Sequence, residues 1–148
     1  MFEGHALVAR AAEVSARRAA WVAWFAGAGY FAAALNWIYE PFMVEPETYG
    51  WMAPFAVLFM AFGLALFWAA AGYATRWLRG AFGFAVALTL AELARGYVLT
   101  GFPWALVGHI WIETPVAQLA AWVGPSGLTL LTLLAAAGLA QMRPLPGV

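Results

Sequence analysis

Four long apolar runs set the strongest limit on how this chain can fold. Short charged or proline-containing segments separate the runs, which cover residues 19–39, 53–75, 80–100 and 115–142. A helix rises about 1.5 Å per residue and the hydrocarbon core of a bilayer is about 30 Å thick, so about 20 apolar residues can cross it. The pattern therefore predicts an all-α membrane protein with about four transmembrane helices.

Composition supports the membrane interpretation. Hydrophobic residues make up 66% of the 148 residues and charged residues only 9%, whereas soluble domains contain roughly 25% charged residues. The net charge is +0, so the chain offers no excess positive charge to nucleic acid. Cysteine, lysine and aspartate are absent, which excludes a disulfide, a thiolate metal site, a cysteine nucleophile and a lysine Schiff base. We predict no catalytic residue, no metal site and no cofactor in this chain.

Two regions are predicted along the chain. Residues 1–18 are expected to form a cytoplasmic surface segment, and residues 19–148 a single transmembrane helical domain. The expected spans are about 19–39, 53–75, 80–100 and 126–142. The first run is longer than the roughly 7–15 apolar residues of a signal peptide, so an uncleaved span is expected.

The fourth apolar run is interrupted by Gly124-Pro125-Ser126-Gly127. Glycine and proline disrupt helices, so residues 116–123 are expected to form a short interfacial or re-entrant helix before the span at 126–142. A single kinked span over 116–142 is the alternative.

Charge placement predicts the orientation in the membrane. With four crossings, six of the seven arginines fall on one side, namely Arg10, Arg17, Arg18, Arg76, Arg79 and Arg143. Four glutamates fall on the other side, namely Glu40, Glu45, Glu47 and Glu113. Positive charge accumulates on the cytoplasmic side of membrane proteins, so both termini are predicted to be cytoplasmic.

The stretch from Glu92 to Trp104 carries the most functional information. Glu92 and Arg95 are three residues apart and share a helix face, so they can form a pair. A charge in the bilayer centre costs about 3 kcal/mol, so neither side chain should face lipid. One interpretation is a self-neutralising pair that fixes this helix against its neighbours. The other is that Arg95 contacts an anionic lipid headgroup entering from the outer leaflet.

Other polar and small residues in the apolar runs carry weaker signals. Asn36 needs a hydrogen-bonding partner on another helix, and Trp37 is typical of the membrane interface. Gly63 and Gly72 are expected to allow close helix contacts. His109 is a lone histidine, which we interpret as structural.

The residues from Glu92 to Trp104 resemble a known family. Glu92-x-x-Arg95-Gly96-Tyr97-Val98-Leu99-Thr100-Gly101-Phe102-Pro103-Trp104 is similar to the signature of bacterial apolipoprotein N-acyltransferases. The segment Asn36-Trp37-Ile38-Tyr39 and the turn Gly124-Pro125-x-Gly127 also resemble segments of that family. The resemblance extends over most of the chain, from residue 25 to residue 142.

The resemblance implies an activity. Family members transfer an acyl chain from a phospholipid to the amino group of a lipoprotein's diacylglyceryl-cysteine, through a thioester on a cysteine in an extracytoplasmic nitrilase-like domain. It implies a location in the bacterial inner membrane and phospholipid and lipoprotein lipids as partners. Arg95 and Trp104 match residues implicated in the family's function. The predicted lipid- and substrate-binding residues are Arg95, Trp104, Glu92, Phe102, Asn36 and Trp37.

The sequence also departs from the family pattern. It has no cysteine or lysine for the catalytic domain, and fewer hydrophobic segments before the first run than family members have. We therefore expect this chain to be inactive alone and to supply lipid binding and scaffold, with a separate nitrilase-like chain as a candidate partner. The alternative is a non-enzymatic lipid-binding or interaction module. A small transporter is disfavoured because few polar residues lie inside the runs.

Overall fold

The described part of the chain is entirely helical in its regular elements. The computed structural model describes residues 2–98, 101 and 103–142, with side chains described from residue 15 onward. The elements in chain order are α1 (Phe2–Ala34), η1 (Asn36–Met43), α2 (Pro46–Tyr49), η2 (Gly50–Met52), α3 (Ala53–Ala74), α4 (Gly80–Tyr97), η3 (Val107–Trp111), η4 (Pro115–Leu119) and α5 (Ala120–Met142), where η marks a 3-10 helix. The predicted all-α class is confirmed for these residues.

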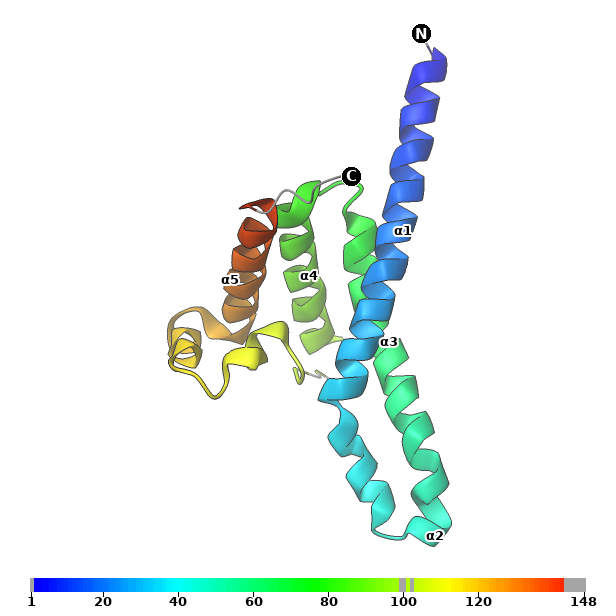
Figure 1. Ribbon diagram of the computed structural model, residues 1–148, viewed down its shortest axis with the longest axis vertical. Coiled ribbons are helices and arrows are strands. Elements are labelled where there is room, and N and C mark those ends of the chain that lie inside the picture. The colour runs from blue at the N-terminus through cyan, green and yellow to red at the C-terminus, as the bar shows by residue number, and fades with distance from the viewer. Residues whose placement is uncertain (1, 99–100, 102, 143–148) are drawn as a thin grey trace.

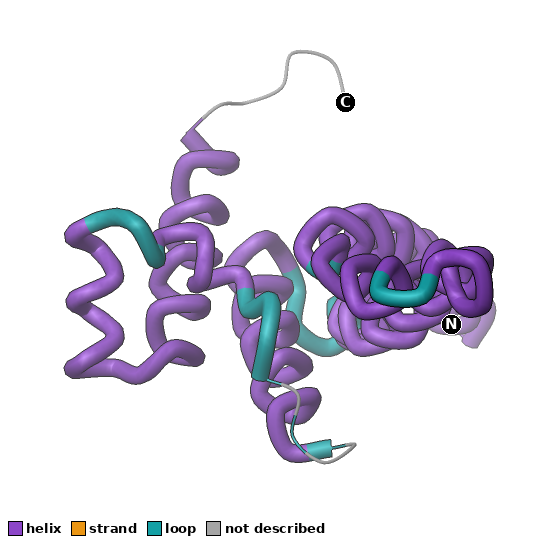
Figure 2. Tube along the Cα trace, turned by 90° about the horizontal axis from the view of Figure 1, so that it is seen from below, coloured by secondary structure: helices purple, strands orange, loops and turns teal. Residues whose placement is uncertain are grey.

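The long helices form two neighbouring groups. α1 runs along α3, and α4 lies beside α3 and packs against α5 (Figure 1). Seen end-on in Figure 2, the α1–α3 pair forms one group and the α4–α5 pair lies to its side. The short helices between α1 and α3 extend beyond the ends of α4 and α5 (Figure 1).

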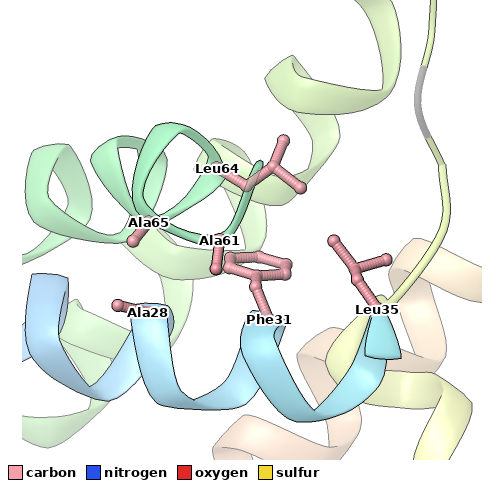
Figure 3. Close-up of a cluster of buried hydrophobic side chains, with 6 residues drawn as sticks. All are labelled: Ala28, Phe31, Leu35, Ala61, Leu64 and Ala65. Carbon is pink, nitrogen blue, oxygen red and sulfur yellow. The ribbon is translucent and has the colours of Figure 1, made fainter. Parts of the chain in front are cut away.

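The α1–α3 pair contains the largest apolar core. Phe31 of α1 and Leu35, directly after its end, are both 0% exposed and lie four residues apart. They pack against alanines and a leucine of α3, namely Ala61, Leu64 and Ala65 (Figure 3). Small residues on α3 leave room for the Phe31 ring, so the two helices approach closely.

Glycine at position 72 allows α1 and α3 to make a close backbone contact. A Cβ atom at Gly72 would lie 2.6 Å from the carbonyl oxygen of Ala19, which is too close for any side chain. The predicted close contact is therefore confirmed at Gly72. The same prediction is wrong for Gly63, where a Cβ would meet nothing within 4 Å.

Two helical segments in the described part of the chain are long and apolar enough to cross a membrane. They are Pro46–Ala74 and Pro115–Met142. Of the four predicted crossings, the two that correspond to α1 and α4 do not meet this test. In α4 the charges of Glu92 and Arg95 lower the average hydropathy.

Large apolar side chains cover the outside of the helices. Phe59 is 81% exposed and Trp122 is 89% exposed. Others are exposed on α1 and α3, namely Trp21, Phe25, Phe55 and Leu66. Contiguous apolar surface of this kind marks contact with a membrane or a partner rather than with water.

Several predicted boundaries differ from the structure. α1 continues without a break through residues 18 and 19, and it ends at Ala34 rather than at residue 39. Residues 40–49, which follow the first apolar run, are mostly helical. Pro46 stands at the start of α2, where its fixed φ and missing N–H favour a helix start. α4 ends at Tyr97, before residue 100.

The fourth apolar run is broken where the sequence indicated. Gly124 has φ 72° and ψ 171°, a conformation that interrupts the helix direction within α5. Residues 115–119 form η4, and the first residues of α5 lie before the break, so a short helical segment precedes the long one. The break at Gly124 is compatible both with a short helix before a separate span and with a single kinked span, since Pro115–Met142 as a whole is long and apolar enough to cross a membrane.

Candidate functional site

Two charged side chains are buried at the C-terminal end of α4. Glu92 is 2% exposed and Arg95 is 1% exposed. Both face neighbouring parts of the chain, because positions three apart on a helix share a face. The prediction that neither faces lipid is confirmed.

Arg95 binds the backbone of the segment that follows α4. Its Nη1 donates to the carbonyl oxygen of Trp104 at 2.8 Å, and its Nη2 donates to that of Ala105 at 3.4 Å. The guanidinium carbon lies 5.0 Å from the centre of the Phe31 ring on α1, within the range of a cation–π contact. A single arginine thus connects α4, α1 and the following loop.

Glu92 binds the same loop two residues further on. Its Oε2 accepts a hydrogen bond from the backbone N–H of Val107 at 3.2 Å. Trp68 of α3 and Thr129 of α5 flank the same carboxylate. Arg95 and Glu92 therefore both form hydrogen bonds with the backbone of the segment after α4. Neither interpretation of the sequence predicted this role.

Three further hydrogen bonds hold this loop, which we call the clamped loop and define as residues 103–111. The Tyr30 hydroxyl of α1 donates to the carbonyl oxygen of Leu106 at 3.1 Å. The Gly108 N–H donates to Thr129 Oγ1 at 3.0 Å, and the Trp111 indole N–H donates to Thr132 Oγ1 at 2.8 Å. Side chains from α1, α4 and α5 converge on one irregular segment and satisfy its polar groups.

One residue of the clamped loop is strained. Ala105 has φ 54°, in the left-handed region, which costs roughly 1–2 kcal/mol for a residue with a Cβ atom. Its carbonyl oxygen is one of the two acceptors of Arg95. Strained backbone persists where surrounding contacts determine it, and such positions cluster at functional sites.

The outer surface of the clamped loop is aromatic. Trp104 is 59% exposed although its carbonyl oxygen is held by Arg95. Trp37 of η1 is 49% exposed, and the two ring centres are 6.2 Å apart. We call these two residues the tryptophan pair. The structure therefore brings Glu92, Arg95, Trp104 and Trp37 together in one site.

Asn36, another predicted site residue, lines a different hollow. Asn36 is exposed and lines a hollow of about 470 Å³ with Tyr39, Glu40 and the start of α3. In the described part of the chain, no hydrogen bond or ring contact joins Asn36 to the tryptophan pair. Phe102 lies outside the described residues.

A cleft of about 230 Å³ opens beside Glu92. Pro103 and Leu106 of the clamped loop, Tyr97 of α4 and Ser126 of the broken turn are among its lining residues. The structure thus places the Gly124–Gly127 turn against the same site as the end of α4. The sequence showed both motifs but not their contact.

Sequence reasoning missed several residues that complete the site. Three of them are aromatic residues within apolar runs, namely Tyr30, Phe31 and Trp68. In such runs an aromatic side chain is usually interpreted as part of the core or as facing lipid. Tyr30 carried a usable signal, because a hydroxyl in an apolar environment needs a hydrogen-bond partner. The spacing of Thr129 and Thr132 was a second signal, since threonines three apart share a helix face.

His109 is half-buried in η3, at the end of the clamped loop. Burial lowers the pKa of His109 below its usual value, and the nearby positive charge of Arg95 lowers it further. The imidazole is therefore neutral at pH 7. Among the residues with described side chains, no three histidine or acidic groups gather as metal ligands.

The comparisons with known proteins agree on one family. Residues 4–138 match the apolipoprotein N-acyltransferase N-terminal domain. The apolipoprotein N-acyltransferase of Caulobacter vibrioides is 49% identical over 129 residues, which is 83% of this chain and 24% of that protein. The proteins of the same name from Rhodopseudomonas palustris and Pseudomonas putida are 40% and 37% identical, covering 78% and 90% of this chain. No solved structure matches the chain.

Fold and site together define a helical protein with candidate membrane spans and an aromatic loop held by buried charges. Within that class, the chain belongs to the apolipoprotein N-acyltransferase family, whose N-terminal domain it matches. The predicted resemblance is confirmed. The chain spans about a quarter of the length of the curated relatives it matches, 24% and 23% for the first two.

Proposed function

We propose that this chain is the membrane portion of an apolipoprotein N-acyltransferase and supplies lipid binding and scaffold to the reaction. The reaction moves an acyl chain from a phospholipid to the N-terminal diacylglyceryl-cysteine of a lipoprotein. Family membership and the names of the relatives support this proposal. Because the chain has no cysteine and no lysine, the thioester chemistry belongs to a nitrilase-like domain outside it.

The observation that carries the proposal is the tryptophan pair on the clamped loop. Trp104 and Trp37 are exposed side by side, while the backbone beneath Trp104 is fixed by Arg95. Tryptophan favours the membrane interface, where one part of the ring is apolar and the N–H is wet. A rigid aromatic surface at that depth suits the glycerol and carbonyl region of a lipid substrate.

Glu92 and Arg95 act in this proposal as positioning residues. Both are almost completely buried, and their described hydrogen bonds go to the backbone of residues 104–107. They hold the loop in a strained conformation and thereby orient the Trp104 ring. Phe102 and Asn36 remain candidate lipid contacts on sequence grounds, next to Pro103 and Trp37 respectively.

The proposed location is the bacterial inner membrane, with α1, α3, α4 and α5 as the four crossings. In this arrangement residues 1–18 lie at the cytoplasmic surface and residues 19–148 form the membrane domain, with both termini cytoplasmic. The arginines of the α3–α4 turn and the glutamates between α1 and α3 support this orientation. The clamped loop then faces the outside, where lipoproteins are acylated.

A chimera tests the proposal. This chain would replace the matched segment of the Caulobacter vibrioides relative, and acylation of a lipoprotein's N-terminal peptide would be measured by mass spectrometry. We expect an active chimera, because 49% identity over the matched residues preserves the packing that the rest of the protein contacts. A chimera that is produced and folded but leaves the peptide unacylated would overturn the proposal. Lipid retention by the chain alone would then favour a non-enzymatic lipid-binding module.

Variants in the same chimera test the site separately. Arg95→Ala leaves Glu92 without its nearby cation, and breaking a buried charge arrangement costs about 3–5 kcal/mol, so acylation should be lost. Trp104→Ala keeps the carbonyl that Arg95 binds and removes only the ring, so retained phospholipid should fall while helix content stays unchanged. Trp122→Ala removes a ring that is even more exposed, on a different element, and serves as the control. Equal lipid retention in both tryptophan variants would reject the site without rejecting the family role.

A further inference from the structure

A second polar site lies at the opposite end of α4 from the clamped loop. A hollow of about 310 Å³ opens between α1 and the turn that joins α3 to α4. Its lining residues are Ser15, Ala16, Thr75, Arg76, Arg79 and Gly80. None of these six residues is acidic, and two are arginines.

The helix packing explains why the hollow is open at this place. α1 and α3 are in close contact at Gly72, against the backbone of Ala19 and Ala20. Directly after the end of α3, Thr75 and Arg76 line the hollow together with Ser15 and Ala16 of α1. The contact at Gly72 fixes the distance between α1 and α3 next to the hollow, so the hollow is a consequence of how the two helices pack.

Arg76 is held in a defined position beside this hollow. Its Nη1 donates to the Tyr73 hydroxyl at 2.7 Å, and its guanidinium carbon lies 4.8 Å from the centre of the Trp77 ring. A guanidinium has five N–H donors, so one bond to Tyr73 leaves most of its donors for an anion. Arg79 is exposed on the same turn and brings a second guanidinium.

The chemistry of the lining favours phosphate. Planar guanidinium groups match phosphate oxygens with paired hydrogen bonds, and the Ser15 hydroxyl adds a further donor. The apolar side chains beside the turn favour a lipid over a soluble anion, because Trp77 is 68% exposed and Leu78 is 40% exposed. An aromatic side chain and a leucine next to arginines suit the boundary between headgroups and acyl chains.

We propose that this hollow binds the phosphate of an anionic phospholipid in the leaflet opposite the clamped loop. The site is separate from the tryptophan pair and does not depend on the acyltransfer reaction. Its role is to anchor the α3–α4 turn at the membrane surface, because juxtamembrane arginines are attracted to anionic headgroups. The glutamates of the segment between α1 and α3 lie at the other end of the helix pair, so charge complementarity selects this end for an anion.

Lipid binding by the full chain in nanodiscs or detergent tests the proposal. Native mass spectrometry would measure retention of phosphatidylglycerol against phosphatidylcholine for the wild type and for Arg76→Gln/Arg79→Gln. Each arginine near an anionic surface contributes about 1 kcal/mol, so the double variant should bind phosphatidylglycerol about 30-fold more weakly. Phosphatidylcholine retention should stay unchanged, as should the helix content measured by circular dichroism.

Two controls separate a built site from diffuse attraction. Arg17→Gln/Arg18→Gln removes the same amount of charge from the neighbouring helix without changing a residue that lines the hollow. Its loss of phosphatidylglycerol binding should be several times smaller than that of the Arg76/Arg79 double variant. Ser15→Trp fills the hollow without changing charge and should also weaken phosphatidylglycerol binding. Equal losses in the two arginine pairs, or wild-type binding by Ser15→Trp, would overturn the proposal. Inorganic phosphate binding that depends on Arg76 and Arg79 as strongly as lipid binding does would overturn the lipid assignment.

Discussion

Arg95 is a buried cation whose hydrogen bonds run to two adjacent backbone carbonyls of the clamped loop. A guanidinium can donate to both from one plane, whereas the compact ammonium of lysine cannot span them in the same way. The sequence predicted that Arg95 turns inward, because exposure of its charge to lipid is costly. It could not predict the acceptors, since backbone carbonyls look alike in every sequence and only the loop path selects two of them.

The strained residue of the clamped loop gives a prediction at this scale. Ala105→Gly removes the Cβ clash of the left-handed conformation at φ 54°, which costs roughly 1–2 kcal/mol, while glycine adds about 0.4–1 kcal/mol of unfolded-state entropy. We therefore expect stability to be unchanged or raised by up to about 1 kcal/mol. Thermal unfolding in detergent, followed by circular dichroism, measures this difference.

Ala94→Gly provides the matched control for Ala105→Gly. Ala94 is exposed inside α4, where glycine costs about 0.5–1 kcal/mol relative to alanine. The two substitutions are chemically identical but should change stability in different directions. Similar losses at both positions would mean that residue 105 is not held in the left-handed conformation.

At the scale of elements, the α1–α3 pair depends on small residues at particular positions. Gly63 and Gly72 look equivalent in the sequence, since both lie in one apolar run among alanines. The two glycines are nine residues apart, which is about two and a half helical turns, so they lie on opposite faces of α3 and only Gly72 meets α1. Which glycine is at the contact is decided by the face that α3 turns toward α1 and not by local composition.

Paired alanine substitutions test this difference. Gly72→Ala would place a Cβ 2.6 Å from the Ala19 carbonyl oxygen, and overpacking of this kind typically costs about 1–3 kcal/mol. Gly63→Ala meets nothing within 4 Å and should gain up to about 1 kcal/mol through its better helix propensity. Thermal unfolding of the two variants in the same detergent gives the comparison. A Gly72→Ala variant as stable as Gly63→Ala would contradict the close packing of α1 on α3.

At the scale of the whole molecule, the two ends of the helix assembly differ in charge. Arginines surround the hollow at the α3–α4 turn, whereas Glu40, Glu45 and Glu47 lie in the segment between α1 and α3. This asymmetry supports the proposed orientation, with the clamped loop outside and the second lipid site at the cytoplasmic face. In the described part of the chain, the segments Pro46–Ala74 and Pro115–Met142 are apolar and long enough to cross a membrane between these two ends.

Single-cysteine labelling can measure the orientation cleanly, because the chain contains no cysteine of its own. Glu47→Cys and Ser15→Cys place thiols at exposed positions near opposite ends of the α1–α3 pair. A membrane-impermeant maleimide added to spheroplasts should label Glu47→Cys, and should label Ser15→Cys only after permeabilisation. Labelling of both positions in intact spheroplasts would contradict a crossing by α1.

The sequence by itself determined the helical class, the presence of helices apolar enough to cross a membrane, the inward direction of Glu92 and Arg95, and the family. These follow from local pattern, since apolar run length and helical spacing act within one segment. Only the tertiary structure decided that the two charges hold a loop, that Tyr30, Thr129 and Trp37 join them, and that Gly72 rather than Gly63 is a contact. The physical reason is that these contacts connect residues far apart in the chain, and their partners are set by how the helices cross and where the backbone turns.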